Sequence, residues 1–173
     1  LKKMNRKITR KEIEATMARV RSQLPDVAWR TTFIVGFPTE TDQDFEELVD
    51  FVSEGHFQHL GIFLYSDEDN IRSSKFGDPI PLSLKEERKN RLMEIQQKIS
   101  REHHQKMVGS LQQVLVGGFS SETDLLLEGR NQYQGPEVDG VVYINEGNAT
   151  SAGFHQVEIT EAHEYDLVGK ILN

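Results

Sequence analysis

The first 65 residues alternate between amphipathic segments and continuous apolar ones. A helical repeat of apolar residues follows Thr9 and Glu12, which fit a capping box. Residues 27–37 then form an apolar run with a β-branched middle, which predicts a strand buried on both faces. Thr41 opens a second helical repeat, and residues 59–65 read as a second strand. This helix–strand–helix–strand order predicts an α/β fold with a parallel sheet and crossover helices.

The pattern changes in the second half of the chain. Ser83 and Glu86 fit another capping box, which predicts the start of a long helix. After Gly109, short alternating segments are separated by Gly, Asn and Ser turns, and they predict a small antiparallel β-barrel of the oligonucleotide-binding type. We therefore expect one domain over residues 1–108 and a barrel domain over residues 109–173. The predicted barrel strands are 111–116, 123–130, 140–144, 154–160 and 165–171.

Composition narrows the possible functions. The 173 residues include no cysteine, so this chain holds neither disulfides nor thiolate metal sites. No apolar run approaches the roughly 20 residues that span a bilayer, and no signal peptide opens the sequence. The formal net charge is −8, and residues 110–173 carry all of it, with ten acidic residues against Arg130 and Lys170. Such a surface repels phosphate backbones and attracts basic partners, although solubility alone also explains an excess of acids.

The segment FIVGFPTET marks the end of the first predicted strand, where ligands of α/β proteins usually sit. Gly36 lets a flat ligand approach the backbone because it has no Cβ, while a tight turn without a ligand explains the same residues. Arg30 begins this strand and is suited to a carboxylate or a phosphate, or to plain solvation. Phe63 and Tyr65 alternate on the second strand, so they wall an adenine pocket if their side faces the ligand and otherwise belong to the core.

The sequence offers no convincing metal or catalytic set. His56 and His59 stand three residues apart at a turn, without the further ligands that a metal site requires. No Ser/His/Asp or Cys/His arrangement is evident, and no pair of acids is placed for acid–base chemistry. We therefore assign no catalytic and no metal-binding residue to this chain.

Several motifs in order resemble those of one family. The segments LKKMNRKITRKEI, WRTTFIVGFPTETDQDFEEL, FLYSDED, QQKIS and EYDLVGKIL resemble the radical SAM methylthiotransferases. GPEVDGVVYIN is closest to the branch that methylthiolates an aspartate of small-subunit ribosomal protein twelve. The resemblance covers essentially all 173 residues. It departs after FLYSDED, where relatives usually have a Gly-Thr pair and this chain has Asn70-Ile71-Arg72.

The resemblance implies the fold class and the binding residues. Residues 1–108 are expected to form the C-terminal part of a radical SAM barrel, a partial TIM-type barrel, and residues 109–173 a TRAM domain, a small barrel that holds the substrate. The first strand is expected to pass the adenine of S-adenosylmethionine. The cofactor-binding residues so implied are Arg30, Phe33, Ile34, Val35, Gly36, Phe37 and Tyr65.

The family's three-cysteine motif for a 4Fe-4S cluster is absent here. We therefore expect this chain to be a C-terminal portion that is inactive alone, and the full-length chain to carry six cysteines upstream for two 4Fe-4S clusters. A non-catalytic binding module would also lack cysteines, and the upstream sequence distinguishes the two hypotheses.

Charge favours a protein substrate. A barrel that grips tRNA should present a basic face with stacking aromatics, whereas residues 110–173 are acidic. We expect a basic ribosomal protein as the partner, with Arg130, Glu137 and Asp139 contacting it, and a cytoplasmic enzyme without membrane association. The tRNA-modifying branch of the same family is the alternative.

Overall fold

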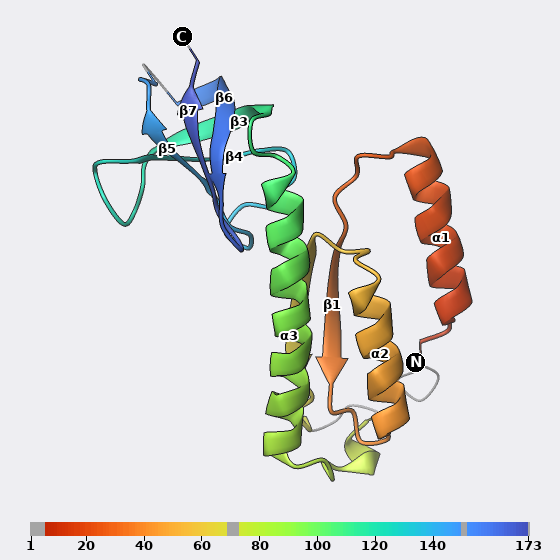
Figure 1. The fold of residues 1–173 in the computed structure, drawn as a ribbon. Helices are drawn as coiled ribbons and strands as arrows, with labels where there is room; N and C mark the ends of the chain where they lie inside the picture. Colours follow the sequence, from red (N-terminus) through yellow and green to blue (C-terminus); the bar gives the residue numbers. More distant parts are fainter. Residues whose placement is uncertain (1–5, 69–72, 150–151, 173) are drawn as a thin grey trace. The chain divides into compact units, whose positions relative to one another are not determined.

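A computed structural model describes residues 6–68, 73–149 and 152–172 (Figure 1). The chain forms two compact units, Leu1–Ile95 and Gln96–Asn173. This division falls inside a long helix, α3 (Leu82–Gln105), whereas the border predicted after residue 108 follows the change of sequence pattern and stays a prediction. Asn70-Ile71-Arg72 lies outside the described residues. None of the helices in the described part is long and apolar enough to cross a membrane.

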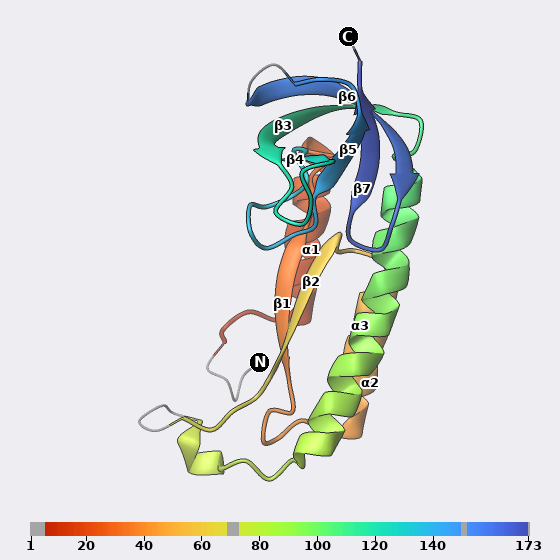
Figure 2. The same cartoon turned by 90° about the vertical axis from the view of Figure 1, so that its left-hand side faces the viewer.

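The first unit has the predicted α/β order. Its elements are α1 (Arg10–Gln23), β1 (Arg30–Val35), α2 (Asp42–Ser53), β2 (His59–Leu64), the short 3₁₀ helix η2 (Ser74–Phe76) and the first part of α3. The two strands pair in parallel, from Arg30 beside His59 to Val35 beside Leu64. Figure 2 shows them side by side. The helix–strand–helix–strand prediction is therefore confirmed.

Of the two predicted capping boxes, the one at Thr9 is present, and Thr41, which was predicted to open a helix, forms a further box. Thr9 accepts from the backbone N–H of Glu12 while the Glu12 carboxylate accepts from Thr9, and Thr41 and Asp44 cap α2 in the same way. The box predicted at Ser83 is wrong, because α3 already begins at Leu82 and Ser83 lies inside it. The carbonyl of Pro81 accepts from two backbone N–H groups of the first turn instead.

The two faces of β1 differ in burial, which corrects the prediction of a strand buried on both faces. Exposed and less exposed residues alternate from Arg30 to Val35, and Val35 is fully buried. Phe33 packs on the helix-facing side, against Phe51 of α2 and against Phe57 in edge-to-face contacts. Met17 of α1 joins this cluster, so the helices cover one face of the sheet.

The carboxyl ends of both strands are fastened to α3 by two basic side chains. The Lys85 ammonium donates to the Tyr65 carbonyl at 2.8 Å and to the Asp78 carboxylate at 2.5 and 2.6 Å. Its methylene chain lies over Gly36, where an added Cβ would collide with it. Gly36 also has φ +79°, a left-handed conformation that favours glycine.

A second contact fixes the same turn. The backbone N–H of Gly36 donates to the Glu40 carboxylate at 3.1 Å, and Arg88 donates to Glu40 at 2.5 Å and to Asp42 at 2.6 Å. The strand end is therefore held from both sides, by Lys85 and by the Glu40–Arg88 pair. Arg88 and Glu40 both have side chains that are largely buried, so solvent screens this pair weakly, whereas Asp42 is exposed.

The second unit is a closed barrel, as predicted. Its strands are β3 (Leu111–Phe119), β4 (Leu127–Arg130), β5 (Val142–Glu146), β6 (Gly153–Ala162) and β7 (Leu167–Ile171). They close in the order β3-β4-β5-β7-β6. All the pairs are antiparallel except β5 with β7, which is parallel. This arrangement is a five-stranded barrel of the oligonucleotide-binding kind.

Small residues allow this barrel to close around its core. The core consists of Val114, Val116, Val142, Ile144, Val157, Ile159, Leu167 and Ile171. A Cβ at Gly129 would lie 2.6 Å from the Val114 side chain, and a Cβ at Gly169 would lie 2.5 Å from that of Val157. Contacts this short do not occur between real carbon atoms, so β4 and β7 need glycine where they approach their neighbours.

We expect Gly169→Ala to destabilise the barrel by about 1–3 kcal/mol, because the added methyl group has to displace both Val157 and the backbone of Glu158. Gly117→Ala is the matched control, since its Cβ would meet only an ordinary contact at 3.9 Å. Hydrogen exchange of the β6 and β7 amides measures the change. Equal protection in the two variants would contradict this account of the core.

We expect Lys85→Met to destabilise the first unit by about 1–3 kcal/mol, since it leaves the Tyr65 carbonyl and the Asp78 carboxylate without their donor. Lys89→Met, one turn further along α3, should cost less than about 0.5 kcal/mol. Trp29 is the only tryptophan and packs against the core of this unit, so its fluorescence during urea unfolding reports on this unit. Identical midpoints for the two variants would show that the buried ammonium does not hold the strand ends.

Candidate functional site

The uncovered face of the β1–β2 sheet is the most distinctive surface of the first unit. Arg30, Thr32 and Ile34 are the exposed residues of β1, and Ile34 is 43% exposed. Ile34 pairs with Phe63 of β2, which is 63% exposed. Side chains of paired residues in a parallel ladder share a face, so these two form an apolar patch. We call Arg30, Thr32, Ile34 and Phe63 the open face.

Gly61 shapes the middle of the open face. It pairs with Thr32, and a Cβ there would lie 3.5 Å from the Thr32 hydroxyl oxygen and 4.0 Å from the Phe63 ring. Without this Cβ, the strip between the hydroxyl and the ring carries no side chain. The open face thus combines a flat apolar surface, a hydroxyl and a guanidinium.

The seven predicted cofactor residues do not share one surface. Arg30 and Ile34 lie on the open face, whereas Phe33 and Val35 point to the helix-facing side. Gly36, Phe37 and Tyr65 lie at the carboxyl ends of the strands and are buried. The rings of Phe37 and Tyr65 meet edge to face at 5.4 Å between centroids.

Gly36 makes contacts that the sequence did not reveal. Its N–H is bonded to Glu40 and its Cα faces the Lys85 methylenes, so protein atoms account for the need for glycine there. Tyr65 differs, because its buried hydroxyl has no hydrogen-bond partner among the described residues. A hollow of about 620 Å³ beside it is lined by residues that include Tyr65, Ser66 and Asp67.

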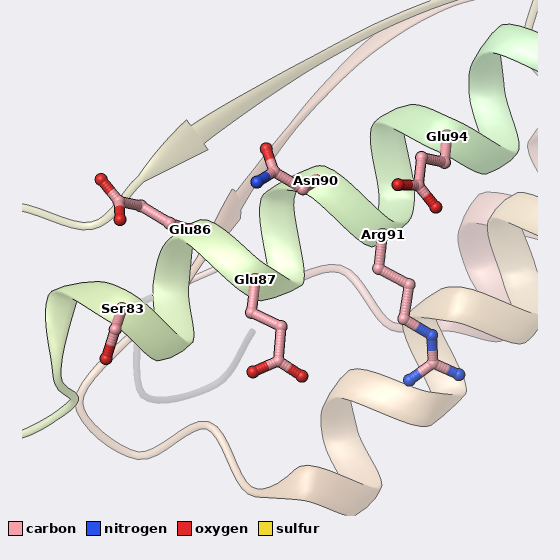
Figure 3. A pocket seen from close by; sticks show the side chains of 6 residues that line it. All are labelled: Ser83, Glu86, Glu87, Asn90, Arg91 and Glu94. Atoms are coloured by element: carbon pink, nitrogen blue, oxygen red, sulfur yellow. The ribbon is translucent and has the colours of Figure 1, made fainter.

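The outer surface of α3 carries several polar side chains but no common centre. Figure 3 shows Ser83, Glu86, Glu87, Asn90, Arg91 and Glu94 pointing in different directions. Arg91 is engaged by Glu46 of α2 at 2.5 Å, and this pair raises the pKa of Arg91 and lowers that of Glu46. Within the described residues, no group of three His, Asp or Glu is placed to hold a metal ion.

Eight of the ten acids in residues 110–173 fall into two sets. One set serves the fold by accepting backbone N–H groups or by pairing with bases, and comprises Asp139, Asp166, Glu158 and Glu164. The other set is exposed and comprises Glu122, Asp124, Glu137 and Glu146. Among the predicted substrate residues, Glu137 is therefore available to a partner, whereas Asp139 accepts from Gly135 at 2.7 Å.

Tyr143 lies in a region of negative electrostatic potential on the barrel. It lies on β5 beside Glu128 of β4, with its neighbours along the strand turned into the core. Burial raises the pKa of its phenol, and the carboxylates of Glu122, Asp166 and Glu128 raise it further. These acids come from two loops and a strand, so the negative charge gathers around β4 and β5.

Arg130 stands apart from this negative surface. It is exposed at the end of β4 and lines a hollow of about 600 Å³ on the barrel. Gln134 lines the same hollow although it is 7% exposed. Phe63 was a sequence candidate for the wall of an adenine pocket and is exposed on the open face, whereas Tyr65, predicted beside it, is buried. The sequence analysis did not identify Thr32 or Gln134 as site residues. The alternation of side chains along a strand could have indicated Thr32. Nothing in the sequence around Gln134 indicates that this loop glutamine is buried.

Two family models match separate parts of the chain. Residues 1–52 match the Radical SAM superfamily and residues 108–172 match the TRAM domain. These matches cover β1 and the closed barrel, respectively.

Curated relatives match almost the whole chain. It is 50% identical over 172 residues, 99% of the chain, to the ribosomal protein uS12 methylthiotransferase RimO of Bdellovibrio bacteriovorus. The proteins of that name from Desulfotalea psychrophila and Geobacter sulfurreducens are 45% and 42% identical over 98% and 100% of the chain. The chain spans 38–39% of the length of these relatives. It therefore belongs to the RimO-type radical SAM methylthiotransferase family, of which it carries the C-terminal radical SAM end and the TRAM domain.

Proposed function

We propose that the protein to which this chain belongs methylthiolates an aspartate of ribosomal protein uS12, and that the two units of the chain have separate tasks. The open face of the first unit forms part of the S-adenosylmethionine pocket, and the acidic barrel docks the substrate. The observation that carries this proposal is the one-sided sheet, which leaves Ile34 and Phe63 exposed on strands of a radical SAM fold. The relatives named above support the choice of substrate.

The residues of the open face fit the cofactor. Ile34 and Phe63 offer a flat apolar surface for a purine, and Thr32 and Arg30 offer donors for the ribose or the methionine carboxylate. The unpartnered Tyr65 hydroxyl adds a polar group at the carboxyl end of β2. The backbone of residues 33–37 shapes this end of the strand, while the side chains of Phe33 and Val35 support it from behind.

This chain does not fit an iron–sulfur cluster, because it contains no cysteine thiolate. When bound, the two 4Fe-4S clusters expected in the full-length enzyme would supply the radical and sulfur chemistry of such an enzyme. The contribution of this chain is to bind and orient. We propose that it is inactive alone.

The barrel favours a basic protein over RNA. Residues 110–173 hold ten acids and two bases, and one of those bases, Lys170, is paired with Glu158 at 3.2 Å. A phosphate backbone approaching Glu122, Glu128 and Asp166 would be repelled, whereas lysines and arginines would be attracted. We accordingly propose a basic ribosomal protein as the partner and the cytoplasm as the location.

We expect Phe63→Ala to weaken S-adenosylmethionine binding about tenfold in the cluster-loaded full-length enzyme, because stacking a base on an aromatic ring contributes roughly 1–3 kcal/mol. Phe119→Ala removes an equally exposed phenylalanine, 68% exposed, from the barrel and serves as the control. Isothermal titration with S-adenosylmethionine measures both. If the two variants bind alike, the open face does not contact the cofactor.

We expect Glu137→Lys to weaken uS12 binding about fivefold at 50 mM salt, with the difference shrinking at 300 mM, since exposed charges act through screened attraction. Glu47→Lys makes the same charge change on α2 of the other unit and should have a smaller effect. Titration at the two salt concentrations measures the affinities. A loss that is the same at both concentrations would argue against electrostatic docking.

A further inference from the structure

The hollow beside Arg130 is chemically unlike the rest of the barrel. Its lining comes from β3, β6, the last residue of β4 and the segment that follows β4. The described residues that form it include no Asp or Glu. Side chains of glutamine and asparagine make up much of this lining. On a segment with ten acids and two bases, a carboxylate-free hollow of about 600 Å³ is a local exception.

One residue that lines this hollow, Gln134, carries an unsatisfied donor. Gln134 is only 7% exposed, and its side-chain oxygen accepts from the backbone N–H of Asn131 at 3.0 Å. Its side-chain NH₂ group has no hydrogen-bond partner among the described residues. A buried donor without an acceptor costs roughly 1–3 kcal/mol. Protein atoms cover this nitrogen, so a ligand that brings an acceptor would recover the cost once the Gln134 side chain turns into the hollow.

Arg130 supplies a second donor at the same place. Its side chain is exposed and, within the described part of the chain, forms no ion pair or hydrogen bond. Lys170, the other base of residues 110–173, is already paired with Glu158. A guanidinium and an amide NH₂ lining one hollow match an acceptor with two oxygens.

An apolar surface completes the hollow. Phe154 is 67% exposed on β6, next to Leu115 of β3, and Leu111 is 58% exposed at the start of β3. An anion alone, such as free phosphate, would leave these side chains uncovered. A peptide that carries a carboxylate beside an apolar residue would cover them and satisfy both donors.

We propose that this hollow holds one carboxylate-bearing residue of the protein substrate, with a neighbouring apolar residue packed on Phe154 and Leu111. The proposal rests on the proposed function for the identity of the partner. A nucleotide phosphate would also suit Arg130, but a phosphate chain extends beyond one contact and meets the acids of the surrounding barrel. A single carboxylate within a basic protein does not incur that repulsion.

The test is a titration of the 173-residue chain with uS12, comparing Arg130→Gln with Lys170→Gln. Each variant removes one positive charge from the barrel, and the long-range effect of that removal is to strengthen binding of a basic protein. We expect Arg130→Gln to weaken binding about tenfold in spite of this, and Lys170→Gln to leave it within about twofold or to strengthen it. Equal affinities for the two variants would overturn the proposal.

A second measurement detects the carboxylate directly. The tetrapeptides acetyl-Gly-Phe-Asp-Gly-amide and acetyl-Gly-Phe-Asn-Gly-amide differ in one charged group. The side-chain amide resonance of Gln134 should shift with the first and not with the second. Equal shifts would overturn the assignment to a carboxylate.

Further outcomes separate this inference from the proposed function. If Glu137→Lys weakens uS12 binding and Arg130→Gln does not, the acidic docking surface stands and the hollow is not part of it. If the wild-type chain does not bind uS12 at any salt concentration, both proposals fail. If Arg130→Gln abolishes binding of single-stranded hexauridylate and spares uS12, the hollow is a nucleotide site and the peptide assignment is wrong.

Discussion

The ammonium group of Lys85, held between the Tyr65 carbonyl and the Asp78 carboxylate, is the interaction that fixes the carboxyl ends of both strands. Its aliphatic chain covers Gly36, and the Glu40–Arg88 pair binds the N–H of that glycine from the other side. A turn fastened at both faces gives the adjoining strands one defined position. The contacts at the strand ends also hold the open face in place, because Ile34 and Phe63 belong to the two strands that end at this point.

In the function that we propose, the two units recognise their ligands by different physical interactions. The first unit offers an apolar face with a few donors, which suits a small planar cofactor. The barrel offers charge, gathered around Tyr143 by Glu122, Glu128 and Asp166, which suits long-range attraction of a basic protein. We propose that the hollow at Arg130 adds short-range selectivity to this acidic surface.

Periodicity predicted most of the fold, because helices and strands of this chain bury one side each. The capping box at Thr9 was predicted because Glu12 stands three residues away, whereas at Thr41 only the start of a helix was predicted and the structure adds the box with Asp44. The capping box at Ser83 was wrongly predicted because Ser83 and Glu86 have the three-residue spacing of a capping box but lie inside α3. The first turn of this helix is already capped by the Pro81 carbonyl. The burial of both faces of β1 was wrongly predicted, since an apolar run does not reveal whether a second layer covers it.

The sites were less predictable because they depend on contacts distant in sequence. The role of Gly36 involves Lys85, 49 positions further on, and nothing near FIVGFPTET indicates that lysine. Asp139 was predicted to meet substrate, a role that the structure does not test, and it also accepts a hydrogen bond from the N–H of Gly135 within its own loop. The resemblance to methylthiotransferases identified the family, and the three-dimensional contacts then separated the exposed residues from the structural ones.

The claim that the barrel recognises a basic protein rather than RNA is tested most directly by binding of the whole chain to uS12 and to tRNA, measured side by side at 50 and 300 mM salt. The account predicts binding to uS12 that weakens with salt, and no measurable binding to tRNA. Binding to tRNA with equal or higher affinity than to uS12 would contradict it.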